Sequence, residues 1–324
     1  MTTLIDRNAK GVYPISVTPF LDNGAVDLES MDRLTDFFLS CQVPGMTLLG
    51  VLGEASKLSA SESMALLQRV LTRAAGRMQV IVGVSHVGLD NFADFTQQVM
   101  EAGASGIMVT PATGLKTEDQ VLNYFEGLMG RIGPVPMALQ DYPQNSGVFM
   151  SVDTIGKLLA RHDNIKILKH EEGSALRKVS KLRLQESSGQ RERVSVLVGN
   201  SGIHLPQELH RGVDGANTGV AFPEMLIEVC RRFFAGQAES GEDLYDTFLP
   251  LVRHEQQPGI GLAIRKEIFR RRGLISSAKV RAPGPVMDAD DQLELTRLLN
   301  RLSRRLDETA QAGLIQSYPV TQGR

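Results

Sequence analysis

The stretch Asn164-Ile-Lys-Ile-Leu-Lys-His-Glu-Glu-Gly173 decides the fold. Its short apolar strand ends on Lys169, and His170, two acids and a glycine follow where a helix should begin. A charged side chain at the end of a buried strand is costly unless it has a partner or a role. Burial also lowers the pKa of a lysine, and a lysine attacks carbonyl groups as the neutral amine. Lys169 is therefore a candidate for forming a Schiff base with a carbonyl substrate. A lysine that extends to the rim of a barrel is the alternative.

The same unit, an apolar strand followed by a helix, recurs along the chain. We expect strands over residues 11–18, 46–50, 79–85, 106–110, 136–140, 165–169, 194–199 and 214–221. Helices are expected over residues 28–41, 89–102, 117–131, 151–161, 174–187, 203–211 and 225–234, and the capping box Ser59-Ala-Ser-Glu62 opens one more. In the sixth strand Lys166 and Lys169 are three residues apart, so they should point to opposite faces.

Eight apolar strands separated by helices predict an α/β fold with a parallel sheet. Such units fit a closed (β/α)8 TIM barrel, which we place at residues 1–236. An open doubly wound sheet is the alternative, but the loop after the first strand, Thr18-Pro-Phe-Leu-Asp22, lacks the Gly-rich fingerprint common there. Residues 237–310 are expected to form a C-terminal helical extension, with helices over 244–252, 260–271 and 293–306, and residues 311–324 a tail.

The composition is ordinary for a globular protein, with 42% hydrophobic and 22% charged residues among 324 and a net charge of −2. Neither a nucleic-acid nor a membrane partner is therefore expected. Cys41 and Cys230 form no CxxC pair, and the polar start of the chain lacks a signal-peptide pattern, so we expect a cytoplasmic protein. His86, His170 and His254 have no partner at metal-ligand spacing, so no metal site is expected.

Active sites of such barrels lie at the carboxyl ends of the strands. In Gly50-Val-Leu-Gly-Glu54, backbone N–H groups could hold a carboxylate, although a tight turn without a ligand is equally compatible. Tyr142 could move a proton, or its ring could pack beside Pro143. Glu171 could be an acid or base, or a helix-start acid that faces the helix dipole. The other strand-end candidates are Gln140, Asn217, Thr218 and the run Gly199-Asn-Ser-Gly202.

In their order and spacing, six motifs resemble the dihydrodipicolinate synthase/N-acetylneuraminate lyase family of class I aldolases and dehydratases. They are Val17-Thr-Pro-Phe20, Gly50-Val-Leu-Gly-Glu54 with Leu58-Ser59, Val109-Thr-Pro111, Gln140-Asp-Tyr-Pro143, Ile167-Leu-Lys169 and Gly215-Ala-Asn-Thr-Gly219. The resemblance implies a barrel with a C-terminal helical extension, assembled as a homotetramer built as a dimer of dimers. It also implies that Lys169 binds pyruvate or another 2-oxo acid as a Schiff base and that no cofactor is needed.

The sequence departs from the family pattern at several points. Val51 and Leu52 stand where the family usually has proton-relaying hydroxyl residues, so backbone N–H groups would hold the carboxylate. Gln140 takes the position of the family's tyrosine, and Tyr142 follows two residues later. Asn145 replaces the arginine that dihydrodipicolinate synthases use for their second substrate, and Ala112-Thr113 replaces their aromatic pair.

The 2-keto-3-deoxy-sugar-acid dehydratases are a more similar branch. The resemblance lies in Gln140-Asp-x-Pro143, Lys169-x-Glu171, Thr218-Gly219, Leu249-Pro-Leu-Val-Arg-His-Glu255 and Lys266-Glu267. It implies a carbon–oxygen or carbon–carbon lyase that acts on a 2-oxo acid, with dehydration favoured. Lys169, Tyr142 and Glu171 would be catalytic, and Gly50, Val51, Leu52, Gln140, Asn217 and Thr218 would bind substrate. Aldol condensation of pyruvate with an aldehyde, a non-catalytic 2-oxo-acid-binding barrel and a phosphate-binding barrel enzyme remain as alternatives.

Overall fold

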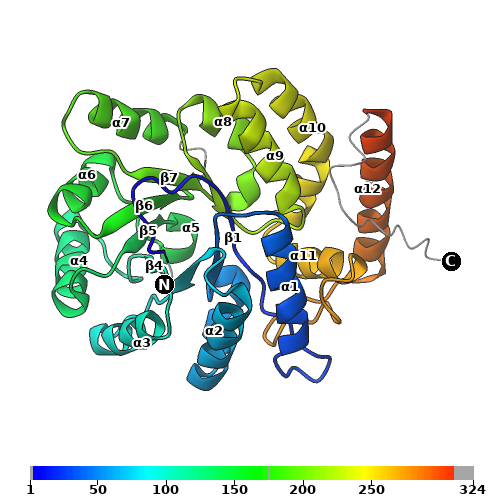
Figure 1. Cartoon of the computed structure of the whole chain (residues 1–324), viewed down its shortest axis with the longest axis horizontal. Coiled ribbons are helices and arrows are strands. Elements are labelled where there is room, and N and C mark those ends of the chain that lie inside the picture. The colour runs from blue at the N-terminus through cyan, green and yellow to red at the C-terminus, as the bar shows by residue number, and fades with distance from the viewer. Residues whose placement is uncertain (1–2, 174–175, 310–324) are drawn as a thin grey trace.

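The computed structural model describes residues 3–173 and 176–309, and in them a parallel eight-stranded sheet forms the centre of the molecule (Figure 1). The strands are β1 (Gly11–Pro14), β2 (Gly45–Leu48), β3 (Gln79–Gly83), β4 (Gly106–Val109), β5 (Met137–Asp141), β6 (Ile165–His170), β7 (Ser195–Val198) and β8 (Gly215–Thr218). Neighbouring strands pair in sequence order, β1 pairs with β8, and a bridge from Ile15 to Thr47 joins β1 to β2. The predicted (β/α)8 barrel is confirmed.

Helices surround the sheet as predicted. They are α1 (Leu28–Ser40), α2 (Ala60–Ala74), α3 (Leu89–Glu101), α4 (Glu118–Ile132), α6 (Val152–Arg161), α7 (Leu176–Ser187), α8 (Leu205–His210) and α9 (Pro223–Phe234). The Ser59 side chain accepts from the Glu62 N–H at 3.2 Å, and Glu62 accepts from the Ser59 N–H at 2.9 Å, so this capping box is confirmed. The first two residues of the helix predicted over 174–187 lie outside the described residues.

Four short elements at the strand ends were not predicted. They are η1 (Val51–Gly53), η2 (Ala55–Lys57), α5 (Pro143–Ser146) and η3 (Asn200–Gly202). Strands β1 and β8 are shorter than predicted, because the chain leaves the sheet after Pro14 and after Thr218 to form the carboxyl-end face. Single turns of this kind carry too few residues to show a periodicity.

The barrel interior is a packed apolar layer. Tyr13, Ile81, Met108, Ala138, Ile167 and Leu197 fill it, and Ile5 and Ala9 of the amino-terminal segment join them. The Ile5 N–H donates to the Ser105 carbonyl at 2.9 Å, which holds this segment against the strands. The interior is therefore a core that supports the carboxyl-end face from below.

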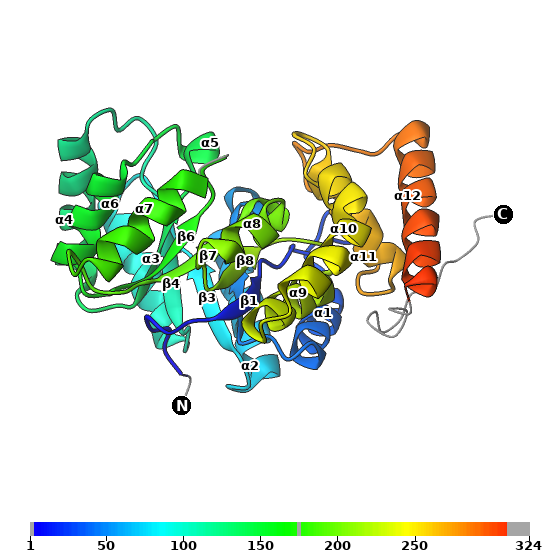
Figure 2. The same cartoon turned by 90° about the horizontal axis from the view of Figure 1, so that it is seen from above.

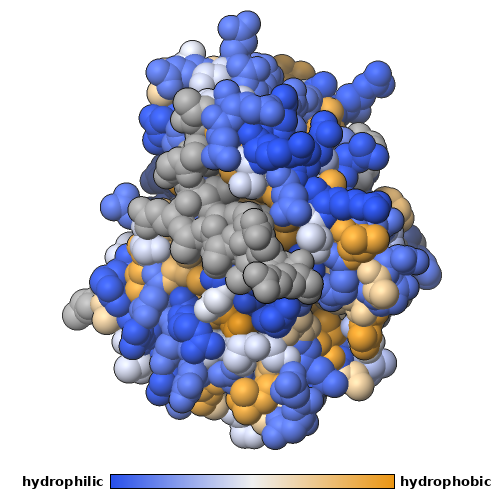
Figure 3. Space-filling view, turned by 90° about the vertical axis from the view of Figure 1, so that its right-hand side faces the viewer, coloured by the Kyte–Doolittle hydropathy of each residue, from blue (hydrophilic) through white to orange (hydrophobic). Residues whose placement is uncertain are grey.

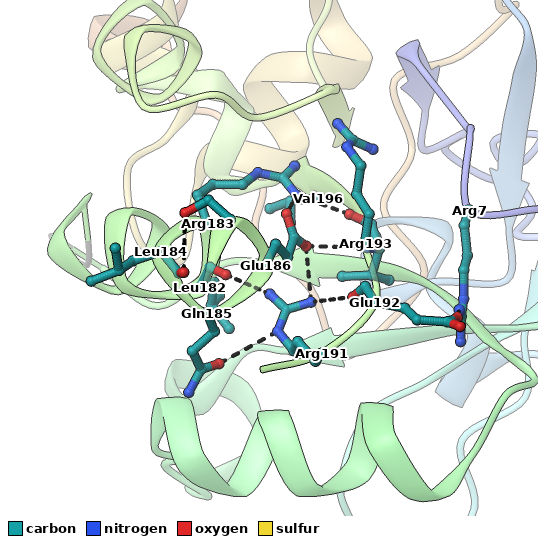
Figure 4. Close-up of polar contacts among 12 residues, drawn as sticks. Arg7, Leu182, Arg183, Leu184, Gln185, Glu186, Arg191, Glu192, Arg193 and Val196 are labelled. Carbon is teal, nitrogen blue, oxygen red and sulfur yellow. Dashed lines mark hydrogen bonds and ion pairs between the residues drawn. The ribbon is translucent and has the colours of Figure 1, made fainter. Parts of the chain in front are cut away.

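An ion-pair network fixes the opposite, amino-end face of the barrel (Figure 4). Arg183 on α7 donates to Glu186 and to Asp214, each at 2.6 Å, and Arg191 donates to Glu186 at 2.8 Å. Arg193 also pairs with Asp214, which precedes β8. The network joins α7, the loop before β7 and the start of β8, so its role is structural.

Three further helices, α10 (Ala238–Glu255), α11 (Gly261–Arg271) and α12 (Ala289–Glu308), form the appended helical unit on one side of the barrel (Figure 2). Tyr245 on α10 donates to the Gly202 carbonyl at 2.8 Å, next to the carboxyl-end face. Lys266 on α11 forms a buried ion pair with Glu54, which lies in the loop after β2. The boundary between residues 236 and 237 stays a prediction, and the predicted tail lies outside the described residues.

The surface on the α12 side is mostly hydrophilic where it is described, with hydrophobic groups scattered among the charged ones (Figure 3). No helix in the described residues is long and apolar enough to cross a membrane. Cys41 and Cys230 are both free thiols.

Candidate active site

Lys169 lies inside the barrel at the carboxyl end of β6. Its side chain is 1% exposed, and Ile167, two residues earlier, belongs to the interior layer, so both point inward. Lys166 on the same strand is partly exposed, as expected for the outward face. The strand therefore delivers one lysine to the carboxyl-end face of the barrel.

Glu171 is the immediate partner of Lys169. Its Oε2 lies 3.0 Å from the Lys169 Nζ, and the Gln140 Nε2 donates to the same oxygen at 2.5 Å. Gln140 and Lys169 are paired residues of neighbouring strands, which places the three side chains together. Burial lowers the pKa of Lys169, and the charge and hydrogen bond of Glu171 oppose that shift. The pair can thus exchange a proton, and a lysine with a lowered pKa can react as an amine.

Gly199 and Asn200, after β7, hold Glu171 in place. A Cβ at Gly199 would lie 2.0 Å from the Glu171 Oε1 and 2.1 Å from its Cγ, so a glycine is needed there. The Asn200 Nδ2 donates to the Glu171 carbonyl at 2.7 Å. The run Gly199-Asn-Ser-Gly202 therefore supports the carboxylate of Glu171.

The turn after β2 is the 3-10 helix η1. Gly53 N donates to the Gly50 carbonyl at 3.0 Å, which leaves the N–H groups of Val51 and Leu52 ahead of the first hydrogen bond of the turn. Val51 is 55% exposed, whereas Leu52 is half-buried, and both line the cavity of Lys169. A Cβ at Gly219 would meet the Leu52 Cδ1 at 2.1 Å, so Leu52 packs directly on that glycine. Gly50 begins the turn and does not line the cavity.

Tyr142 and Thr218 reach the Lys169 cavity, and Asn217 does not. Burial raises the pKa of Tyr142 and the charge of Glu171 adds to that shift, so the phenol keeps its proton near neutral pH. The Thr218 Oγ1 accepts from the Ser201 N–H at 2.7 Å. The Asn217 Nδ2 instead donates to the Thr47 Oγ1 at 2.9 Å, within the barrel wall.

The site has two connected chambers. The inner chamber, of about 70 Å³, contains Lys169, Glu171 and Gln140. The outer chamber, of about 600 Å³, opens above it and is bounded by residues from α8, α10 and α11. Five residues line both chambers and form the neck between them: Leu52, Tyr142, Asn200, Gln256 and Arg265.

Arg265 is the main site residue that the sequence analysis missed. It comes from α11, is 3% exposed, and its Nε lies 3.3 Å from the Glu255 Oε2. Its Nη2 donates to the Ser201 Oγ at 2.9 Å and to the Glu255 carbonyl at 3.1 Å. Ser201 also donates to the Gln256 Oε1 at 2.5 Å. The appended helices thus supply one wall of the neck.

Two other charged clusters lie outside the cavity. The His170 Nδ1 contacts the Asp141 Oδ2 at 3.0 Å, and Lys178 donates to the same oxygen at 2.6 Å. His170 is therefore a buried residue that contacts Asp141, although its sequence context showed no partner at metal-ligand spacing. Glu54, which ends the β2 motif, pairs with Lys266 and accepts from the Arg281 N–H at 3.0 Å, so it anchors the extension. In the described residues no group of three or more His, Cys, Asp or Glu side chains could hold a metal ion.

Comparison with known proteins agrees with this fold. L-2-keto-3-deoxyarabonate dehydratase from Azospirillum brasilense is 28% identical over 307 residues, which cover 93% of this chain and 97% of that one. A 4-hydroxy-tetrahydrodipicolinate synthase from Geobacter metallireducens is 28% identical over 239 residues, covering 73% of this chain and 79% of its own. The crystal structure of dihydrodipicolinate synthase from Rhodopseudomonas palustris has a TM-score of 0.90 and 40% identity, and covers 93% of this chain and 100% of that chain.

An eight-stranded barrel with a buried lysine at the carboxyl end of β6 is the scaffold of a TIM-barrel lyase. The model of the dihydrodipicolinate synthetase family matches residues 8–302. The chain therefore belongs to that family, whose members are lyases, and the resemblance seen in the sequence motifs is confirmed at the family level.

Proposed function

We propose that this protein is a lyase that binds a 2-oxo acid as a Schiff base on Lys169, with dehydration of a 2-keto-3-deoxy sugar acid as the favoured reaction. The observation that carries the proposal is the buried pair of Lys169 and Glu171, 3.0 Å apart in an inner chamber of about 70 Å³. A lysine whose pKa burial has lowered is suited to attack a carbonyl carbon.

Imine formation comes first. The neutral amine of Lys169 adds to C2 of the 2-oxo acid, and the C2 oxygen leaves as water after it is protonated. The substrate carboxylate accepts hydrogen bonds from the N–H groups of Val51 and Leu52, the two free donors at the start of η1. The protonated imine then draws electrons from the neighbouring carbon, so no cofactor is required.

Elimination follows in the dehydratase. Glu171 removes a proton from C3, and the electron pair of that bond moves into the imine to give an enamine. The enamine expels the C4 hydroxyl, which takes a proton from Tyr142 and leaves as water. Hydrolysis of the imine regenerates Lys169, and the proton passes from Glu171 back to Tyr142 through water. General acid–base help of this kind typically contributes about 10²–10⁴-fold to the rate.

Aldol condensation or cleavage is the second candidate. Several relatives are named 4-hydroxy-tetrahydrodipicolinate synthase, including the one from Geobacter metallireducens, and these favour it. The same imine would serve both reactions, because it stabilises a carbanion at C3 whichever bond is broken. Val51, Leu52 and Asn145 in place of the expected hydroxyl residues and arginine favour dehydration.

Reductive trapping tests the proposal. Incubation with pyruvate and borohydride should add the mass of a reduced pyruvate adduct to the peptide that contains Lys169. Lys169→Ala should abolish the adduct, and the matched control Lys166→Ala, on the outward face of the same strand, should keep it. Failure to trap pyruvate or any 2-oxo sugar acid would remove the Schiff-base mechanism. An adduct without turnover of any sugar acid or aldehyde would instead support the non-catalytic alternative.

We also propose a cytoplasmic homotetramer, built as a dimer of dimers, on the strength of the family resemblance. Light scattering after size-exclusion chromatography gives the test, since a mass near 35.4 kDa would indicate a monomer and one four times larger the tetramer.

A further inference from the structure

The neck connects the small chamber around Lys169 to a much larger one. The inner chamber is about 70 Å³, and its far side is closed by the packed barrel interior. The outer chamber is about 600 Å³ and reaches the inner one past Tyr142, Gln256 and Arg265. A substrate chain that continues beyond C3 into the outer chamber therefore passes Arg265.

Arg265 has one donor group left for a substrate. Its Nε and Nη2 are engaged by Glu255 and Ser201, whereas Nη1 donates to no group in the described part of the chain. The guanidinium is buried, so an oxygen that reaches Nη1 would form a hydrogen bond to a charged donor away from bulk water. Such bonds are stronger than those between neutral groups.

The outer chamber has polar groups but little positive charge. Its lining includes the carboxyl groups of Glu172, Glu208 and Glu255, and the amides of Gln144, Gln256 and Gln257. Arg265 is the one arginine or lysine among the lining residues that the structure describes, and it is already paired with Glu255. Amide and carboxyl groups together can both accept from and donate to hydroxyl groups.

We infer that the neck and the outer chamber form a subsite for the hydroxylated, uncharged end of the 2-oxo acid, with Arg265 as the residue that selects it. The inference rests on the proposed function, because Lys169 anchors the substrate. Arg265 Nη1 donates to the first chain hydroxyl that passes the neck, and the amides and carboxyl groups bind the hydroxyl groups beyond it. A second carboxylate at the far end would be buried without a cation of its own, which is costly, so the subsite rejects diacids.

Four probes of graded chemistry test the subsite by borohydride trapping on Lys169. Pyruvate reports imine formation alone, and 2-oxopentanoate adds chain length. 2-Oxoglutarate and 2-keto-3-deoxypentonate have the same number of carbons as 2-oxopentanoate. The first carries a second carboxylate, and the second carries hydroxyl groups. We expect the half-saturating concentration for 2-keto-3-deoxypentonate to be at least about tenfold below that of 2-oxopentanoate, the gain from one charged hydrogen bond. The half-saturating concentration for 2-oxoglutarate should lie above that for 2-oxopentanoate.

Variants of Arg265 assign the gain to this side chain. Arg265→Gln should raise the half-saturating concentration of 2-keto-3-deoxypentonate to that of 2-oxopentanoate, a larger loss than the one it causes for pyruvate. Arg265→Lys keeps a charge opposite Glu255, and so protects the fold if the glutamine variant is unstable, but it lacks the planar fork and should lose the advantage as well. Arg270→Gln, on the same helix with a half-exposed side chain outside both chambers, is the matched control.

The outcomes separate the two proposals. Absence of any trapped adduct overturns the proposed function. Trapping of pyruvate with no preference for 2-keto-3-deoxypentonate, or with a preference for 2-oxoglutarate, overturns the subsite and leaves the Schiff base standing. An equal loss of pyruvate and 2-keto-3-deoxypentonate in a folded Arg265→Lys variant also overturns it, because Arg265 would then support the imine site itself.

Discussion

Replacing Gly199 with alanine should disable the site although Lys169, Glu171 and Tyr142 are all unchanged. The substitution adds a single methyl group at the end of β7, directly before η3. That methyl would lie 2.0 Å from the Glu171 Oε1 and 2.3 Å from its Cδ. Carbon and oxygen atoms in contact need about 3 Å or more, so the carboxylate must shift by about 1 Å.

A shift of that size moves Glu171 off Lys169, whose Nζ now lies 3.0 Å away. A misplacement of about 1 Å can cost about 10²-fold in rate, and we expect a loss of this order in Gly199→Ala. The assay is the rate constant of pyruvate trapping on Lys169, followed by mass spectrometry, and kcat once the substrate is identified. Thermal unfolding checks that the fold is kept.

Two further variants make the interpretation specific. Gly130→Ala on α4 is the matched control, because its methyl would meet nothing within 4 Å, and its rate should be unchanged. The shorter side chain of Glu171→Asp withdraws the carboxylate from the new methyl group. The loss of rate in the double variant should therefore be smaller than the combined losses of Glu171→Asp and Gly199→Ala. Trapping in Gly199→Ala within about twofold of wild type, or strictly additive effects, would refute the packing argument.

Three other changes have expected outcomes. Glu171→Gln removes the charge that opposes the lowered pKa of Lys169, so the acidic limb of the pH profile of pyruvate trapping should move to lower pH; an unmoved limb would contradict the pairing. Burial raises the pKa of Glu208 from 4.5 to about 8, so the wild-type protein should lose stability as the pH rises between these two values. Urea unfolding at several pH values measures this loss, and the loss should be smaller in Glu208→Gln. Lys266→Met leaves Glu54 buried beside Lys57 alone, which should lower the free energy of unfolding by about 3 kcal/mol; a change below about 1 kcal/mol would show that the pair is dispensable.

The fold was predictable because its signals are local and repeated. Every strand of the barrel was expected within a few residues of where it lies, and the capping box at Ser59 closes as expected. Helix α10 was predicted too short, starting at residue 244 rather than Ala238. The reason is Gly241, which resembles a helix breaker in the sequence, yet a Cβ there would lie 2.8 Å from the Phe233 ring, so close packing of α9 on α10 requires it.

The site was predictable where strand ends build it. Lys169, Glu171 and Gln140 follow from strand position, and the structure brings them together. Arg265 was missed because it lies on a helix far along the chain, and no local pattern shows which strand end that helix reaches. A signal was nevertheless present. Arg265, Lys266 and Glu267 are consecutive charged residues between buried Ile264 and Ile268, and such residues need partners inside the protein.

The position of α10 and α11 has a consequence for how this protein could change over time. The amine and its carboxylate partner belong to the strands and their loops, whereas Gln256 and Arg265 lie on or beside helices added after the barrel is complete. Substitutions in those helices can redirect which molecules are accepted while the bond-making groups stay as they are. In the proposed mechanism, reactivity and selectivity are thus encoded in separate stretches of the chain, and each could be altered without rebuilding the other.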